Sequence, residues 1–189
     1  MYASKVKSKF IRFRKQRICQ GDVLRGLEFI VGAPTSKVEA EVESSLDEQY
    51  WVVMTQDCDL SQDYNQRLAT ARMNSSCIRS ILLCPAYPAR QFYLGTHLKD
   101  WDMDTFNAKK SKKIMNNDEY KRYHYLEGKT ELGVPEFVID FKHFFTVPVD
   151  VVYKQRKTIY IATIGELYRE ELSQRFANFL SRIGLPDAV

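Results

Sequence analysis

Apolar residues along this chain gather in short runs that polar segments separate, a pattern typical of β-strands. The first run, residues 23–31, follows Gly21 and Asp22, two residue types that favour turns. The run 50–55 is dense in aromatic and β-branched residues and is too continuous for a strand with one face in water. A third run, 77–87, ends among prolines, which cannot donate to a sheet. The first half of the chain is therefore predicted to consist mainly of strands.

The second half of the chain continues this pattern and adds helices. Strands are predicted at 122–126 and 157–164, and residues 135–153 contain two further β-like runs. A short helix is predicted within 89–113, where aspartates offer N-caps at Asp100 or Asp102.

The clearest helix is predicted over residues 166–183. Apolar side chains recur there at helical spacing on one face, namely Leu167, Leu172, Phe176, Phe179, Leu180 and Ile183. Strands therefore come first and one long helix comes last, so the predicted fold class is α+β and β-rich. We expect an SH3-like, PemK-like small barrel or a curled antiparallel sheet over 18–160, with a C-terminal amphipathic helix. Residues 1–17 are predicted to be a basic N-terminal arm, and residues 18–189 a single domain.

Composition narrows the class of protein. With 44% hydrophobic and 13% aromatic residues, the chain has enough apolar surface for a core. Apolar runs fall short of the roughly 18 residues of a membrane span, and the N-terminus lacks the apolar region of a signal peptide. We therefore expect a cytoplasmic protein with no membrane partner. The four cysteines lack the paired spacing of zinc ligands, so reduced thiols and no resident metal or cofactor are expected.

The positive charge is unevenly placed, although the net charge is only +4. Seven cations and no acid lie in the first segment: Lys5, Lys7, Lys9, Arg12, Arg14, Lys15 and Arg17. A second cluster consists of Lys109, Lys110, Lys112 and Lys113. Clusters of this kind suit phosphate backbones, although they are also typical of a solvated arm or loop. The predicted nucleic-acid-binding residues are these eleven.

Residues 20–87 resemble the PemK/MazF toxin family of small β-barrels. The matching segments are the turn and strand that begin at Gly21 and Asp22, the apolar strand and polar turn "VVMTQ" at 52–56, and the strand end "LLCP" at 82–85. The resemblance implies a small barrel in this part of the chain, and the segments after residue 90 have no counterpart in that family.

The positions that carry catalysis in the family differ here. Ribonucleases of that family use an arginine just before the second matching strand and a threonine or serine just after the third. This chain has Glu48, Gln49 and Tyr50 at the first place and Ala86 and Tyr87 at the second. The resemblance thus implies the fold without the ribonuclease site.

A cysteine between two aspartates follows the strand at 50–55 and is the first candidate for chemistry. A nucleophilic thiolate needs a base or a cation beside it, and carboxylates near Cys58 would raise its pKa. A partner base would come from one of the histidines, His97, His124 or His143. We therefore expect Cys58 to be a core residue at the end of a strand. Asp57 and Asp59 are the preferred functional side chains.

A metal-dependent nuclease is the alternative. In an extended strand Asp57 and Asp59 share one side, and with Asp63 they would offer the oxygen ligands that Mg²⁺ prefers. Period-two counting also places Glu136, Asp140 and Lys142 on one side of a strand, a faint likeness to PD-(D/E)XK nucleases. The same sequence pattern is also expected for a strand whose solvent-exposed face carries alternating charges and has no catalytic role.

Two function classes follow from these patterns. The favoured one is a non-enzymatic binding or assembly module of a bacterial or phage-type system, related to defence or toxins, that contacts a protein partner, another copy of itself or nucleic acid. The other is a nuclease whose candidate catalytic residues are Asp57, Cys58 and Asp59, with Mg²⁺ required only in that case. The first is favoured because the sequence offers no complete catalytic set.

Overall fold

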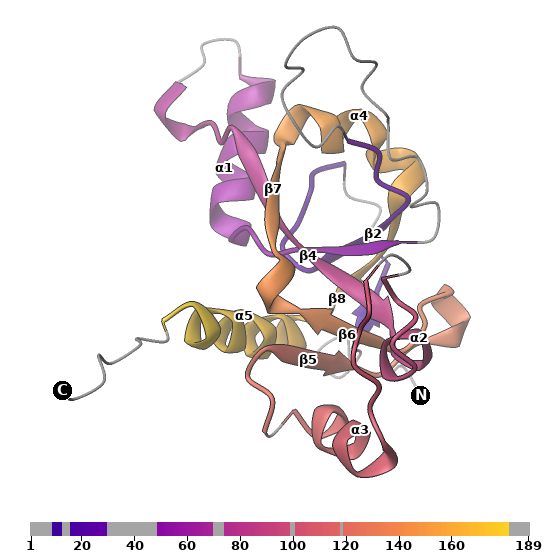
Figure 1. The fold of residues 1–189 in the computed structure, drawn as a ribbon. Coiled ribbons are helices and arrows are strands. Elements are labelled where there is room, and N and C mark those ends of the chain that lie inside the picture. Colours follow the sequence, from indigo (N-terminus) through magenta and orange to yellow (C-terminus); the bar gives the residue numbers. More distant parts are fainter. Residues whose placement is uncertain are drawn as a thin grey trace, which may run out of the picture.

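The computed structural model describes residues 9–12, 16–29, 49–69, 74–98, 101–117 and 119–181. Within these ranges the fold is α+β, with one curled antiparallel sheet of eight strands and five α-helices around it (Figure 1). The strands are β1 (Phe10–Ile11), β2 (Asp22–Arg25), β3 (Tyr50–Val53), β4 (Ser80–Pro88), β5 (Tyr123–Leu126), β6 (Phe137–Asp140), β7 (Phe145–Pro148) and β8 (Tyr160–Ile164). The helices are α1 (Asp57–Leu68), α2 (Ala89–Tyr93), α3 (Ala108–Met115), α4 (Val149–Ile159) and α5 (Glu166–Leu180).

The strand order is β1-β8-β2-β3-β4-β6-β5, and β7 pairs with the first half of β4. Every pairing is antiparallel. The long strand β4 pairs with β3, β6 and β7 and so joins the two ends of the sheet.

Strand β3 is buried on both faces, as its continuous apolar pattern predicted. Successive side chains of a strand point to opposite faces. Tyr50 and Val52 therefore enter one hydrophobic cluster, while Trp51 and Val53 enter another. The sheet separates two cores, and β3 contributes to both.

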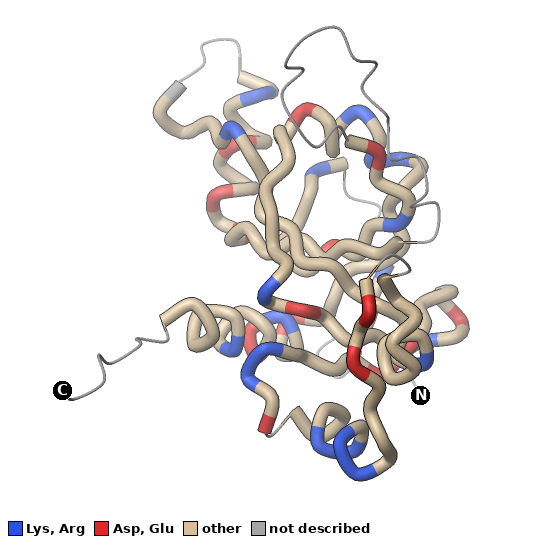
Figure 2. The backbone as a smooth tube through the Cα atoms, in the orientation of Figure 1, with Lys and Arg blue, Asp and Glu red and all other residues tan. Residues whose placement is uncertain are grey.

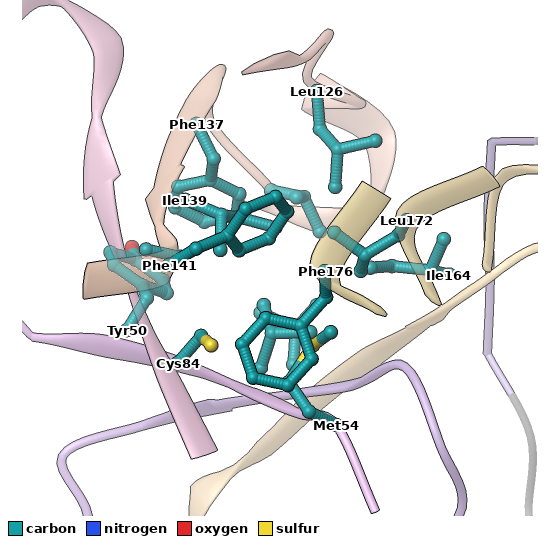
Figure 3. Close-up of a cluster of buried hydrophobic side chains, with 14 of the residues drawn as sticks. Tyr50, Met54, Cys84, Leu126, Phe137, Ile139, Phe141, Ile164, Leu172 and Phe176 are labelled. Carbon is teal, nitrogen blue, oxygen red and sulfur yellow. The ribbon is translucent and has the colours of Figure 1, made fainter. Parts of the chain in front are cut away.

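The first core lies between the sheet and α5 (Figure 3). Leu172, Phe176 and Phe179 of α5 are buried there, and Phe176 packs edge-on against Phe141 with ring centroids 5.4 Å apart. Two residues of the predicted apolar face, Leu167 and Leu180, are exposed instead. The buried stripe of α5 is thus narrower than its sequence suggested.

The second core lies under α1 and α4, which contribute Leu60 and Val152 respectively. A third, smaller cluster packs Phe92 of α2 and Ile114 of α3 against Tyr123 of β5. This third cluster fixes α3 to the edge of the sheet. Figure 1 shows α1 and α4 in the upper part of the molecule and α3 in the lower part.

The second β-like run within 135–153 is only partly a strand. Strand β7 ends at Pro148, and α4 begins at Val149. The residues Val149, Val152 and Ile159 are buried at helical spacing, so burial of one helix face outweighs the strand preference of β-branched residues.

The predicted helix within 89–113 is two helices, α2 and α3. Asp102 does not cap either of them, and Asp100 lies outside the described residues. The N-cap of α3 is Asn107, whose side chain accepts a hydrogen bond from the Lys110 backbone nitrogen at 3.0 Å.

The segment predicted as a basic arm is partly built into the sheet. Phe10 and Ile11 form β1 and pair with β8, and Phe10 is fully buried. Removal of residues 1–17 would therefore take a strand and a core side chain from the domain.

Candidate functional site

The segment 57–63 is helical, and its first carboxylate is bound by the protein itself. Asp57 begins α1 and accepts two hydrogen bonds from Arg17, Nη1 to Oδ1 at 3.0 Å and Nη2 to Oδ2 at 2.8 Å. The Gln20 backbone nitrogen donates a third, at 3.2 Å. Burial raises the pKa of Asp57, but the hydrogen bonds and charge of Arg17 outweigh it, so the pKa of Asp57 lies below its usual value. Asp57 joins the segment before β2 to the start of α1.

Cys58 and Asp59 are exposed, and the geometry predicted for them is wrong. Residues two apart on a helix point about 200° apart, so Asp57 and Asp59 do not share a side. The Cys58 thiol lies 3.6 Å from Gln56 Oε1 and 3.7 Å from Asp59 Oδ1. Cys58 is therefore a surface residue and not part of a core. Its neighbours supply acceptors, and neither of them is a cation or an imidazole that would favour the thiolate.

Asp63 has no exposed surface and holds α1 against the segment that leads into β4. Its carboxylate accepts a hydrogen bond from Arg67 Nε at 2.6 Å and one from the Ile78 backbone nitrogen at 3.1 Å. The three aspartates thus have three different surroundings. In the part of the chain that the structure describes, no group of three or more potential ligands is placed to hold a metal ion.

The predicted strand face with Glu136, Asp140 and Lys142 is also not formed. Strand β6 ends at Asp140, and Lys142 lies in the short 3-10 helix (Phe141–His143) that follows. Asp140 is fully buried and accepts hydrogen bonds from Arg122 at 2.8 and 2.6 Å and from the Lys142 backbone nitrogen at 2.9 Å. Its carboxylate also lies 3.3 Å from His143 Nδ1. The Asp140 carboxylate is therefore bound by groups of the domain itself.

The histidines that the sequence offered as bases for Cys58 contact other residues. His143 lies beside Asp140, and the His97 ring packs 4.6 Å from the ring of Tyr87. His124 lies in β5, parallel to the ring of Phe141.

The described cations of the first segment contact the domain. Lys9 forms an ion pair with Glu127, and Arg12 Nε donates to the Ile161 carbonyl oxygen at 3.1 Å. Arg17 binds Asp57, as described above. Four other predicted nucleic-acid-binding residues, Lys5, Lys7, Arg14 and Lys15, lie outside the described residues.

The lysines of the second cluster lie on α3 and face solvent. Lys109, Lys110 and Lys112 are exposed, and within the described ranges their side chains have no ion-pair or hydrogen-bond partner. Lys113 differs because its Nζ binds Glu119 Oε1 at 2.6 Å. Figure 2 shows α3 as a basic element at the lower end of the molecule. We call Lys109, Lys110 and Lys112 the α3 lysine face.

A cleft lies beside α3, and the sequence did not reveal it. Its volume is about 430 Å³. It lies where the end of α3, β5, the residue before β6 and α5 meet. The lining residues are Lys9, Met115, Asn116, Asn117, His124, Tyr125, Leu126, Glu127, Glu136, Tyr168 and Glu171. We call it the β5 cleft.

Acidic and aromatic groups dominate the wall of the β5 cleft. Three glutamates, Glu127, Glu136 and Glu171, share it with a single cation, Lys9. Lys9 Nζ pairs with Glu127 and lies 5.8 Å from the centroid of the Tyr168 ring. Burial, the charge of Glu136 and a hydrogen bond with it raise the pKa of the Tyr125 hydroxyl.

His124 supplies an unsatisfied polar atom in this wall. Its side chain is 1% exposed, and its Nδ1 has no hydrogen-bond partner among the described residues. Burial and the nearby charge of Arg175 lower the pKa of His124 to about 3, so the ring is neutral at physiological pH. A buried polar atom without a partner costs free energy, and such atoms are rare in native folds.

The β5 cleft combines residues that are remote in the sequence, from Lys9 to Glu171. Neither spacing nor periodicity links these positions, so sequence patterns carried no signal for the site.

Comparison of the chain with protein-family models, with curated proteins and with solved structures found no match. Among the described residues, no helix has the length and apolar character needed to cross a membrane.

Proposed function

We propose that this chain is a non-catalytic binding module that contacts nucleic acid through the α3 lysine face. The observation that carries the proposal is the exposure of Lys109, Lys110 and Lys112 on one short helix without acidic partners in the described residues. Unpaired ammonium groups gathered in this way attract phosphate, because binding releases the counterions of the nucleic acid.

The arrangement of α3 supports contact along one surface. At about 100° per residue, the three side chains span an arc of about 160°. Ile114, one turn after Lys110, is buried in the third hydrophobic cluster and anchors the helix to the domain. The lysines are therefore held on a fixed element, which lowers the entropy lost on binding.

The surroundings of the acidic residues favour binding over catalysis. Asp57 and Asp63, which the nuclease alternative requires, are engaged by Arg17 and Arg67 respectively. Both are thus used in contacts that hold the fold together.

The segments that resemble PemK/MazF proteins lie in β2, β3 and β4, which are neighbours in the sheet. This adjacency supports a PemK-like arrangement for that part of the sheet. A nucleic-acid-binding role for such a module fits a bacterial or phage-type system, in which a protein partner or a second copy would supply further contacts.

The test is the affinity for labelled single-stranded RNA and DNA, measured by fluorescence anisotropy. Replacement of Lys109, Lys110 and Lys112 together by alanine is expected to weaken binding about tenfold or more. The matched control replaces three other exposed lysines, Lys142 after β6 and Lys154 and Lys157 on α4, and so removes the same charge.

The control variant is expected to bind within about twofold of the wild type, because its lysines lie away from α3. Equal loss in both triple variants would show that net charge alone drives binding and would contradict the proposed surface. No detectable binding by the wild type at low salt would contradict the function itself.

A further inference from the structure

We propose that the β5 cleft binds the ammonium group of a primary amine, presented either by a free alkylamine or by the lysine side chain of a peptide. The cleft volume of about 430 Å³ falls within the range of small-molecule sites. Three features of its wall select an amine: surplus carboxylates, a bound ammonium group of the chain itself, and a buried acceptor without a partner.

The surplus of carboxylates is the first feature. Lys9 neutralises Glu127, and this leaves the charges of Glu136 and Glu171. Neither of these two glutamates forms an ion pair in the part of the chain that is described. The site is therefore negative overall and disfavours phosphate, so the nucleic acid proposed for α3 is not its ligand.

Lys9 is the second feature, because it shows how the wall holds an ammonium group. Its Nζ contacts the Glu127 carboxylate and faces the Tyr168 ring at 5.8 Å from the centroid. A carboxylate and an aromatic face together are a recurrent environment for an organic cation. Tyr125, beside Glu136, offers a second ring of the same kind in this wall.

His124 is the third feature. Its neutral imidazole is buried in the cleft wall, and Nδ1 lacks a partner among the described residues. A neutral imidazole offers one nitrogen as an acceptor, and an ammonium group has three donors. An N–H donor bound in the cleft would satisfy a group that the fold leaves unsatisfied.

Apolar surface in the same wall suits the carbon chain of an amine. Met115 and Leu126 line the cleft beside the polar groups. An alkyl chain that ends in an ammonium group can cover these residues while its charged end reaches Glu136 or Glu171.

The experiment uses isothermal titration calorimetry of the full chain with two probes. Putrescine represents the free alkylamine, and the amide of Nα-acetyl-lysine represents the peptide side chain. Butanediol and the amide of Nα,Nε-diacetyl-lysine are the uncharged controls. Binding of putrescine alone assigns the site to free amines, and binding of the lysine amide, alone or with putrescine, assigns it to side chains. Binding of neither, or equal binding of the uncharged controls, overturns the proposal.

Matched variants locate the site. Glu171→Gln is expected to weaken amine binding about tenfold, since it removes one charged contact. The control Glu170→Gln removes the same charge from the neighbouring exposed position of α5, outside the cleft lining, and is expected to change affinity less than about twofold. Equal loss in the two variants would overturn the assignment to this cleft.

Lys9→Ala gives a test with the opposite sign. It frees Glu127 and the Tyr168 ring, so amine affinity is expected to rise several-fold. Weaker binding after this change would mean that Lys9 itself holds the ligand, and would overturn an ammonium site in favour of an anion site. The result is independent of the α3 lysine face, because Lys109, Lys110 and Lys112 stay in place.

Discussion

Two groups of carboxylates in this molecule differ in what holds them. Asp57 and Asp63, on α1 in the upper part of Figure 1, are close in sequence and are bound by arginines and backbone amides of the domain. Glu136 and Glu171, in the β5 cleft, are remote in sequence and have no cationic partner among the described residues. Asp57 and Asp63 therefore stabilise the fold, whereas Glu136 and Glu171 carry charges that no ion pair of the described residues neutralises.

The two groups of carboxylates differ because the oxygens of the first group already accept hydrogen bonds within the domain. A carboxylate whose two oxygens accept hydrogen bonds from fixed donors has fewer lone pairs left for a ligand, and an arginine beside it neutralises the charge that would attract a metal ion. Asp63 and Asp140 meet this description, and each lies where two segments of the chain must be joined. Removal of a carboxylate charge that holds the fold together should lower the free energy of unfolding. Removal of a charge that only binds a ligand should leave it unchanged.

The largest effect is expected from a third buried carboxylate, Asp22, and it depends on pH. Burial raises the pKa of Asp22 from 3.8 to about 6, although hydrogen bonds from Thr163 and the Cys19 backbone nitrogen and the charges of Arg156 and Arg17 oppose the rise. An acid with a higher pKa in the folded state binds its proton more tightly there. Its contribution to stability is therefore full below the unfolded pKa and is lost as the pH rises through about 6.

The expected change is about 2.5 kcal/mol between pH 4 and pH 7, from a difference of about two pKa units. It is measured as the free energy of unfolding of the wild type minus that of Asp22→Asn, by urea titration across this range. Because the difference is read against pH, a constant cost of the substitution does not enter. A difference that stays level from pH 4 to pH 7 would refute the raised pKa.

The next largest effect is expected for Asp63→Asn. The substitution removes a charge with no exposed surface and leaves Arg67, which is 25% exposed, without its buried partner. We expect a loss of about 2–3 kcal/mol in the free energy of unfolding. The control is Asp150→Asn, because Asp150 binds the same Arg67 but is 69% exposed. An exposed ion pair contributes at most about 1 kcal/mol, so similar losses in the two variants would contradict the role of burial.

The smallest effects on stability are expected for substitutions of three adjacent residues at the start of α1. Asp57→Asn is expected to cost about 1–2 kcal/mol because it weakens the paired hydrogen bonds with Arg17. Asp59→Asn and Cys58→Ser, at exposed positions, are expected to change stability by less than about 0.5 kcal/mol. Chemical denaturation of the three variants under one condition is the measurement. A large loss of stability for Cys58→Ser would show that Cys58 is buried. No loss of stability for Asp57→Asn would show that the hydrogen bonds with Arg17 do not stabilise the fold.

Parts of the fold could be predicted because burial on both faces leaves a direct mark on the sequence. The β3 run "YWVV" is one example, and the buried stripe of α5 at Leu172, Phe176 and Phe179 is another. Helix α1 was missed because its sequence, "DCDLSQDYNQRL", buries only Leu60 and Asp63 and so has almost no apolar periodicity.

The two candidate sites also differ in how far the sequence could predict them. The α3 lysine face could be predicted because its residues are neighbours in the sequence, and Ile114 is the buried residue that holds their helix to the domain. The β5 cleft could not be predicted, since it exists only once the residue before β1, strand β5 and helix α5 have been brought together. Its histidine, His124, looks in the sequence like any polar residue between tyrosines.

The central claim is that the α3 lysines are available to phosphate, whereas Asp57 and Asp63 of α1 hold the fold together. The most direct test is the slope of the logarithm of oligonucleotide affinity against the logarithm of salt concentration. Each phosphate contact contributes about 0.7 for single strands, so the slope should fall by about 2 in magnitude when Lys109, Lys110 and Lys112 become alanine. The triple variant of Lys142, Lys154 and Lys157 should keep the wild-type slope. An unchanged slope after replacement of the α3 lysines would contradict the claim.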